Sequence, residues 1–115
     1  MERTLYVSDL DGTLLDSQSK VSPASAALLN RAVGEGALFT IATARTPATV
    51  DTLMADVKLR LPAVVMTGAA LWHQATRSLS DFVTIPSDAA HRVLDAFRAG
   101  GVPGFVYFFR KGKID

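Results

Sequence analysis

The chain has 115 residues, of which 49% are apolar and 20% are charged, and its formal net charge is +1. This composition can bury the core of one small domain, and the balanced charge excludes nucleic acid and anionic membrane as default partners. The absence of cysteine excludes disulfides and thiolate chemistry. No stretch approaches a signal peptide or the roughly 20 apolar residues that span a bilayer, so we expect a soluble, cytoplasmic protein.

Short apolar stretches alternate with amphipathic ones over the first half of the chain. Residues 5–7 predict a buried strand, and Ser22 and Pro23 predict the start of a helix that ends near Gly36. The same alternation then predicts a strand, a helix and a strand, at residues 37–43, 46–59 and 62–67. This β-α-β-α-β order indicates an α/β fold with a parallel sheet covered by helices on both faces.

The pattern changes after the third predicted strand. Residues 70–86 show mixed alternation and predict a hairpin or short extended segments. Pro86 opens a third predicted helix, and residues 105–109 predict a further strand. We therefore expect one unit over residues 1–85 and the beginning of a second, incomplete unit over residues 86–115.

Small polar or acidic residues follow all three predicted strands of the first unit. They are Asp9 and Asp11 after the first strand, Thr43 after the second, and Thr67 with Gly68 after the third. Ligands of parallel α/β sheets bind beyond the carboxyl ends of the strands. We therefore expect these residues to contribute to one site.

The spacing of the two acids favours a site for phosphate and a metal ion. Residues i and i+2 of an extended chain project to the same side, so Asp9 and Asp11 can face one crevice. Each like-charged pair there costs about 4 kcal/mol, which a hard cation such as Mg²⁺ removes. Gly12 allows a sharp turn and offers an open N–H to phosphate, and Thr43 and the helix start after it can also bind phosphate. One carboxylate can act as a nucleophile and the other as a general acid and base.

Three segments together resemble a known family. "DLDGT", at the end of an apolar strand, resembles the first motif of the haloacid dehalogenase-like (HAD) phosphohydrolases. "FTIATAR" resembles their second motif, and "VVMTGAALW" resembles the segment after which the Cof-type branch inserts its α/β cap. The resemblance implies a Rossmann-like three-layer HAD core with the start of an α+β cap. It also implies Mg²⁺-dependent hydrolysis of a small phosphorylated metabolite, a sugar phosphate or phosphorylated cofactor, through an aspartyl-phosphate.

The resemblance also implies a role for each motif residue. Asp9 would be the nucleophile and a magnesium ligand. Asp11 would be the general acid and base, with its backbone carbonyl on the metal. Gly12 and Thr43 would bind the transferring phosphoryl group. The residues implied on the substrate side are Arg45, Thr67 and Gly68.

The chain departs from the family pattern in three places. Ala44 replaces a common Gly, Thr67 replaces the usual Asn, and no third-motif Lys or fourth-motif acidic pair follows. We therefore expect the 115-residue chain alone to be nearly inactive. We also expect the strand at residues 5–7, which is central in the family's sheet, to expose an unpaired edge that promotes self-association.

Other readings remain open from the sequence. The chain would also fit a non-catalytic truncated fragment or an interaction module, or a receiver-type phosphoacceptor domain, which uses strand-end acids and Mg²⁺ as well. Asp9 and Asp11 would equally fit a turn-capping role. We expect His73 to be a structural histidine of the predicted hairpin.

Overall fold

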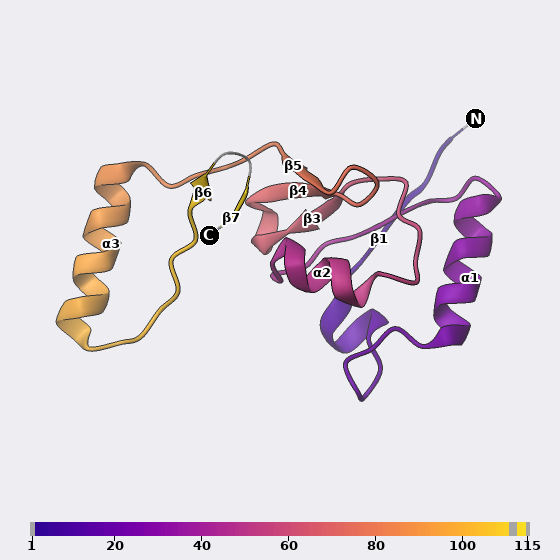
Figure 1. The fold of residues 1–115 in the computed structure, drawn as a ribbon, viewed down its shortest axis with the longest axis horizontal. Coiled ribbons are helices and arrows are strands. Elements are labelled where there is room, and N and C mark those ends of the chain that lie inside the picture. Colours follow the sequence, from indigo (N-terminus) through magenta and orange to yellow (C-terminus); the bar gives the residue numbers. More distant parts are fainter. Residues whose placement is uncertain (1, 111–112, 115) are drawn as a thin grey trace. The chain divides into compact units, whose positions relative to one another are not determined.

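The computed structural model describes residues 2–110 and 113–114 (Figure 1). It divides the chain into two units, Met1–Phe82 and Val83–Asp115. The first unit contains five strands, and the second contains a helix followed by a short hairpin. Each unit is described by itself below.

The strands of the first unit meet in the order β1-β2-β3-β4-β5. β1 and β2 pair in parallel, and an isolated parallel bridge between Ala42 and Val64 connects β2 to β3. β3, β4 and β5 then pair antiparallel. The strand bounds are Leu5–Ser8 (β1), Leu38–Ile41 (β2), Ala63–Val65 (β3), Ala70–His73 (β4) and Ser78–Ser80 (β5). The predicted β-α-β-α-β order with a parallel sheet is confirmed, and the carboxyl ends of β1, β2 and β3 lie at one edge of it.

Helix α1 (Pro23–Gly34) begins where the sequence predicts. Ser22 is its N-cap, and the Ser22 hydroxyl accepts a hydrogen bond from the backbone N–H of Ser25. Ala26 and Val33 are its buried residues, on the side that faces the core. Capping and apolar spacing were therefore sufficient to locate this helix.

Helix α2 (Pro47–Leu53) is shorter than the predicted span of residues 46–59. The cause is a contact from far along the chain. The Gln74 side-chain amide donates to the carbonyls of Met54 and Val57, and its oxygen accepts from the N–H of Leu59. These hydrogen bonds occupy backbone carbonyl and N–H groups just beyond the helix. The chain can therefore leave the helical conformation without leaving those groups unpaired.

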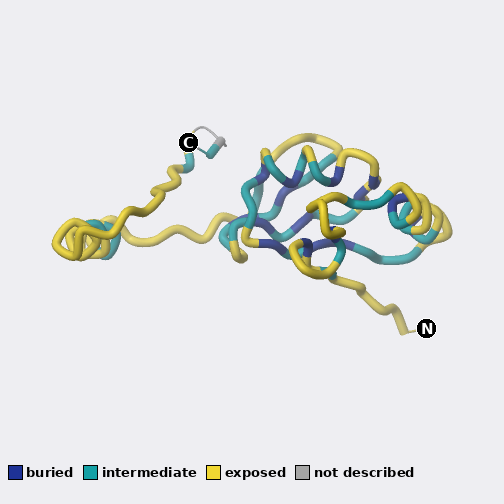
Figure 2. Tube along the Cα trace, turned by 90° about the horizontal axis from the view of Figure 1, so that it is seen from below, coloured by how far each residue is buried: buried dark blue, intermediate teal, exposed yellow. Residues whose placement is uncertain are grey.

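The prediction that residues 5–7 form a buried strand is wrong about burial. Leu5, Tyr6 and Val7 are 54%, 60% and 51% exposed, and Figure 2 shows the N-terminal segment largely exposed. β1 pairs with β2 on one side and ends its sheet on the other. The open edge expected for this strand is therefore present in the described part of the chain.

The hairpin predicted after the third strand is formed by β4 and β5. Within it, His73 Nε2 lies 2.7 Å from Ser80 Oγ, which joins the two strands. This contact fits the structural role expected for His73. No helix in the described part of the chain is long and apolar enough to cross a membrane.

The second unit contains α3 (Ser87–Gly100), β6 (Phe109–Arg110) and β7 (Lys113–Ile114). The predicted third helix is confirmed, but the strand predicted over residues 105–109 is wrong except at its last residue. Phe105 is 91% exposed. A strand needs a pairing partner as well as apolar residues. In the described residues, pairing of this segment begins only at Phe109.

The turn η2 (Met66–Gly68), just after β3, holds an unusual backbone conformation. Met66, Thr67 and Gly68 all have positive φ, at 52°, 56° and 90°. Glycine adopts this region freely, but a β-branched residue such as Thr67 does so with strain. Such strain persists when the surrounding structure fixes the backbone, and it occurs preferentially at functional sites.

We predict that Thr67→Asn stabilises the chain. Asparagine enters the left-handed region more readily than threonine, so the free energy of unfolding should rise by about 0.5–1 kcal/mol. Urea denaturation followed by circular dichroism measures the change. Thr52→Asn, in α2, is the matched control and should leave stability nearly unchanged. A Thr67→Asn variant no more stable than that control would show that the turn is not strained.

Candidate active site

The two acids of the first motif lie directly after β1. Asp9 is extended, with φ −71° and ψ 160°, and its Oδ1 accepts a hydrogen bond from the N–H of Leu10 at 2.8 Å. Leu10 is fully buried, whereas Asp9 and Asp11 are exposed. Gly12 has φ 76°, the left-handed conformation that the predicted sharp turn requires. The buried Leu10 therefore anchors a turn that leaves both carboxylates on the surface.

Thr43 lies just beyond β2 and organises the next turn. Its side chain is buried, and its Oγ1 accepts a hydrogen bond from the N–H of Arg45 at 3.1 Å. The backbone N–H of Thr43 donates to the carbonyl of Val64. Because Oγ1 acts here as an acceptor, its own hydrogen remains available to donate to an anion.

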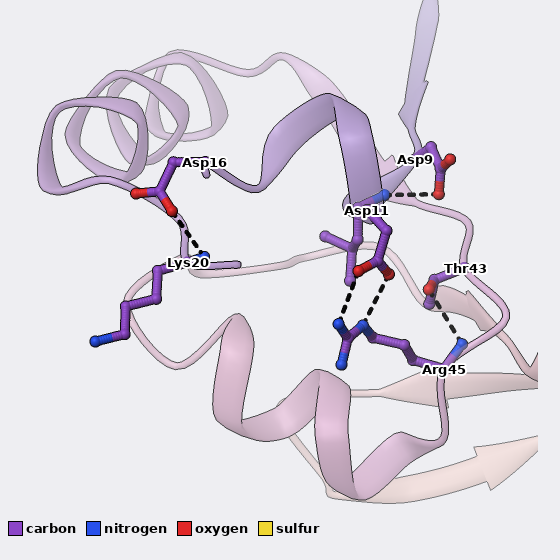
Figure 3. A network of polar contacts seen from close by, with 7 residues as sticks. Asp9, Asp11, Asp16, Lys20, Thr43 and Arg45 are labelled. Carbon is purple, nitrogen blue, oxygen red and sulfur yellow. Dashed lines mark hydrogen bonds and ion pairs between the residues drawn. The ribbon is translucent and has the colours of Figure 1, made fainter. Parts of the chain in front are cut away.

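Asp11 and Arg45 form a bidentate ion pair between the first and second motifs (Figure 3). Arg45 Nε donates to Asp11 Oδ2 at 2.8 Å, and an Arg45 terminal nitrogen donates to Asp11 Oδ1 at 2.7 Å. These hydrogen bonds lower the pKa of Asp11 and raise the pKa of Arg45. Asp11 is therefore ionised in this structure at neutral pH.

The third strand end joins the same cluster through its backbone. The N–H of Met66 donates to the carbonyl of Arg45 at 3.0 Å, and the N–H of Thr67 donates to the carbonyl of Thr43 at 3.1 Å. The strained turn η2 is thus bonded to the turn that carries Thr43 and Arg45. Sequence reasoning missed Met66, because it takes part through its backbone and its side-chain type gives no signal.

The structure brings some predicted site residues into contact and leaves others apart. Asp11, Thr43, Arg45 and Thr67 are linked by the hydrogen bonds above. The Asp9 carboxylate is bonded to the adjacent Leu10 N–H and points away from the Asp11–Arg45 pair in Figure 3. The two carboxylates that were expected to face one crevice thus have different hydrogen-bond partners, Leu10 N–H for Asp9 and the Arg45 guanidinium for Asp11. Gly12 and Gly68 supply positive-φ turns beside these residues.

The strand-end site lies on the surface of the first unit, where Asp9 and Asp11 are both exposed. Among the described residues, no group of three or more His, Cys, Asp or Glu side chains is placed to hold a metal ion. A small cavity of about 100 Å³ lies elsewhere, beside the amino end of β3 and lined in part by Arg60 and His73. It is well below the roughly 300 Å³ of a typical ligand pocket and does not include the strand-end residues.

A family model for haloacid dehalogenase-like hydrolases matches residues 6–113. The chain belongs to this family. The predicted family resemblance is thereby confirmed, and it favours a hydrolase ancestry over the receiver-type alternative. A search of curated proteins found no match.

Solved structures of HAD proteins share the fold. A protein from Bacteroides thetaiotaomicron, described among the phosphatases of the HAD superfamily, is 24% identical with a TM-score of 0.73, over 86% of this chain and 36% of its own. A haloacid dehalogenase-like hydrolase from B. subtilis is 26% identical with a TM-score of 0.74, over 84% and 34%. A HAD/COF-like hydrolase from Plasmodium vivax is 20% identical with a TM-score of 0.71, over 97% and 42%. The chain thus spans well under half the length of each of these HAD proteins.

The Asp11–Arg45 ion pair makes the folding stability of the chain depend on pH. Folding lowers the pKa of the Asp11 carboxyl. The ion pair therefore adds to the free energy of unfolding at pH values above the pKa that Asp11 has in the unfolded chain. This contribution is lost as the pH falls through the lower pKa that Asp11 has in the folded chain.

We predict that Arg45→Gln raises the pKa of Asp11 toward its ordinary value. A pH titration of the Asp11 side-chain carboxyl ¹³C signal by NMR measures this shift. Arg60→Gln removes the same charge from an exposed position elsewhere in the first unit and should leave the Asp11 titration unchanged. An Asp11 titration that is identical in wild type and Arg45→Gln would show that the ion pair is not populated in solution.

Proposed function

We propose that the protein containing this chain is a Mg²⁺-dependent phosphatase of small phosphate monoesters that works through an aspartyl-phosphate at Asp9. The main support is the convergence of three strand ends: Asp9 and Asp11 after β1, the Thr43–Arg45 turn after β2, and the strained turn η2 after β3. Membership in the HAD family supports the class of reaction. Residues 1–85 would then form part of the core, and residues 86–115 would begin a cap that selects the substrate.

The proposed chemistry takes place in two displacements at phosphorus. An Asp9 carboxylate oxygen attacks the phosphorus atom, and the bond from phosphorus to the leaving alcohol breaks as Asp11 donates a proton to that alcohol. A water molecule then attacks the phosphorus atom of the phosphorylated Asp9, and the bond from phosphorus to the Asp9 oxygen breaks. Asp11 accepts the proton of the water, inorganic phosphate leaves, and Asp9 returns to its carboxylate form.

Arg45 sets a condition on the first displacement. Asp11 can donate a proton only if it is protonated, yet the ion pair with Arg45 holds it ionised. Arg45 must therefore release Asp11 when substrate binds. A substrate phosphate offers the oxygens that would attract the guanidinium away, because bidentate arginine contacts suit phosphate as well as carboxylate. With Arg45 in place, Asp11 is suited to the second step, in which it acts as a base.

The donor set fits a partly hydrated Mg²⁺. One Asp9 oxygen is bonded to Leu10 N–H, which leaves the other for a metal, and both Asp11 oxygens are bonded to Arg45. We propose that Asp9 Oδ2 and the Asp11 backbone carbonyl hold the ion, since Mg²⁺ commonly takes one or two protein oxygens and keeps several waters. The ion would neutralise the repulsion between Asp9 and the incoming phosphate.

The remaining site residues would bind the substrate. Thr43 would donate its hydroxyl hydrogen to a phosphoryl oxygen, and the Gly12 backbone N–H would support it. Thr67 and Gly68 would face the part of the substrate beyond the phosphate. A sugar phosphate or a phosphorylated cofactor is the proposed substrate class. Self-association through β1, which pairs with β2 alone in the described residues, is a second proposal on partners.

A non-catalytic role for the 115-residue chain is the second candidate. It is favoured by the exposure of the apolar residues Leu5, Tyr6 and Val7 of β1 in the described structure. Comparing turnover of the 115-residue chain with that of the complete open reading frame separates the two candidates. Turnover only in a longer product would assign catalysis to the whole protein, and turnover in neither would favour the interaction role.

We predict that Asp9→Asn, in the product of the complete open reading frame, lowers kcat/KM by more than roughly 10⁴-fold, because an amide cannot form the acyl-phosphate. Asp11→Asn should also be severe. Hydrolysis of p-nitrophenyl phosphate with Mg²⁺ measures both effects.

Asp16→Asn is the matched control for these variants. Asp16 Oδ1 accepts from the N–H groups of Gln18 and Lys20, and an asparagine retains that oxygen. Its activity should match wild type. Wild-type turnover by Asp9→Asn would remove Asp9 from the role of nucleophile.

A further inference from the structure

Asp11 and Gly12 form the one Asp–Gly sequence in the chain, and such a sequence can rearrange its own backbone. The Gly12 nitrogen can attack Cγ of Asp11, because glycine has no side chain to obstruct the approach. Wherever else an aspartate precedes another residue, that residue carries a side chain, which crowds the attacking nitrogen. Asp11 is therefore the aspartate whose sequence favours this reaction most.

The rearrangement proceeds through a cyclic imide and needs no reagent other than water. As the bond between the Gly12 nitrogen and Asp11 Cγ forms, the bond from Cγ to one carboxyl oxygen breaks. That oxygen leaves as water with the carboxyl proton and the Gly12 amide proton. Water then adds to either carbonyl of the imide. Opening at the side-chain carbonyl restores aspartate, whereas opening at the main-chain carbonyl leaves isoaspartate, in which the chain runs through the former side chain.

The backbone of the folded turn opposes this ring closure. Asp11 has ψ 125°, whereas the ring closes only when the Gly12 nitrogen eclipses Cβ, which for an L-residue is a ψ of negative sign. The N–H of Leu15 donates to the carbonyl of Leu10 at 2.9 Å and so closes the turn around the Asp11–Gly12 peptide. Leu10 is fully buried, which anchors that turn. Attack by the Gly12 nitrogen therefore requires the turn to open locally.

Arg45 restrains the reacting carboxyl itself. Arg45 Nε donates to Asp11 Oδ2 at 2.8 Å and a terminal Arg45 nitrogen donates to Oδ1 at 2.7 Å, so both carboxyl oxygens are bonded (Figure 3). Two parallel hydrogen bonds fix the orientation of the carboxyl plane as well as its position. The carboxyl cannot turn toward the Gly12 nitrogen, nor release an oxygen, until these bonds break.

We propose that Asp11–Gly12 is a site of spontaneous isoaspartate formation, which Arg45 suppresses by holding the Asp11 carboxyl. The rate is then set by how often the pair and the turn open, because only the open form reacts. Arg45 is a positioning residue in this reaction, since it takes no part in the bond changes. Isoaspartate adds one methylene to the main chain and would displace Gly12 from Thr43. The modification does not depend on the proposed phosphatase activity and is measured without substrate or metal.

Ageing the 115-residue chain at neutral pH and constant temperature tests whether the fold protects the site. Trypsin cleaves after Arg3 and Lys20 and releases residues 4–20 as one peptide, in which electron-transfer fragmentation locates isoaspartate. A synthetic peptide of residues 4–20, which lacks Arg45, is the unprotected reference. Isoaspartate at residue 11 should accumulate at least about tenfold more slowly in the folded chain than in the peptide. Equal rates would overturn the proposal.

Arg45→Gln tests the part played by the guanidinium. Isoaspartate at residue 11 should form about threefold faster or more in this variant than in wild type, because the carboxyl is released more often. Arg60→Gln removes the same charge from an exposed position and should match wild type. Asp16 lies in the same tryptic peptide and is bonded within its own loop, so its isomerisation should not change.

Two results would contradict the role of Arg45. One is an unchanged rate at residue 11 in Arg45→Gln, and the other is an equal acceleration at residue 16 in a folded variant. Circular dichroism melting curves establish that each variant is folded. Where Arg45→Gln is unfolded, Arg45→Lys takes its place with the same expectation, because lysine keeps the charge but not the two-bond geometry.

Discussion

The turn at residues 43–45 holds the candidate site together because it is bonded to the strand ends on both sides. Toward β1, the Arg45 side chain holds Asp11 by two hydrogen bonds. Toward β3, the carbonyls of Thr43 and Arg45 accept the N–H groups of Thr67 and Met66. Three loops that are far apart in sequence are thereby fixed relative to one another, which is the positioning that phosphoryl transfer requires.

The same ion pair opposes the general-acid role that is proposed for Asp11. A general acid needs a proton at the working pH, whereas the Arg45 guanidinium lowers the pKa of Asp11. Arginine also binds phosphate well, so a substrate that attracts Arg45 would release Asp11 and raise its pKa at the moment a proton is required. In this account, Arg45 couples substrate binding to the protonation of Asp11, and neither residue can be understood without the other.

Local signals in the sequence predicted much of the fold. Ser22 and Pro23 located α1, the apolar runs located β1, β2 and β3, and Asp9, Asp11 and Gly12 located the turn after β1. Predictions failed where a distant contact or a missing partner decided the outcome. Gln74 ends α2 early from 20 residues away. In the described residues, β1 has a pairing strand on one side only, and residues 105–108 have none. The Asp11–Arg45 pair likewise spans 34 residues, so spacing alone could not reveal it.

The most direct test of the central claim is to identify the phosphorylated residue during turnover. The product of the complete open reading frame is mixed with a phosphate monoester and Mg²⁺, quenched in acid while hydrolysis proceeds, and mapped by mass spectrometry. The account predicts a phosphoryl group on Asp9, absent when a chelator replaces Mg²⁺ and more abundant in Asp11→Asn. A phosphoryl group on a different residue, or turnover with none on Asp9 in Asp11→Asn, would contradict it.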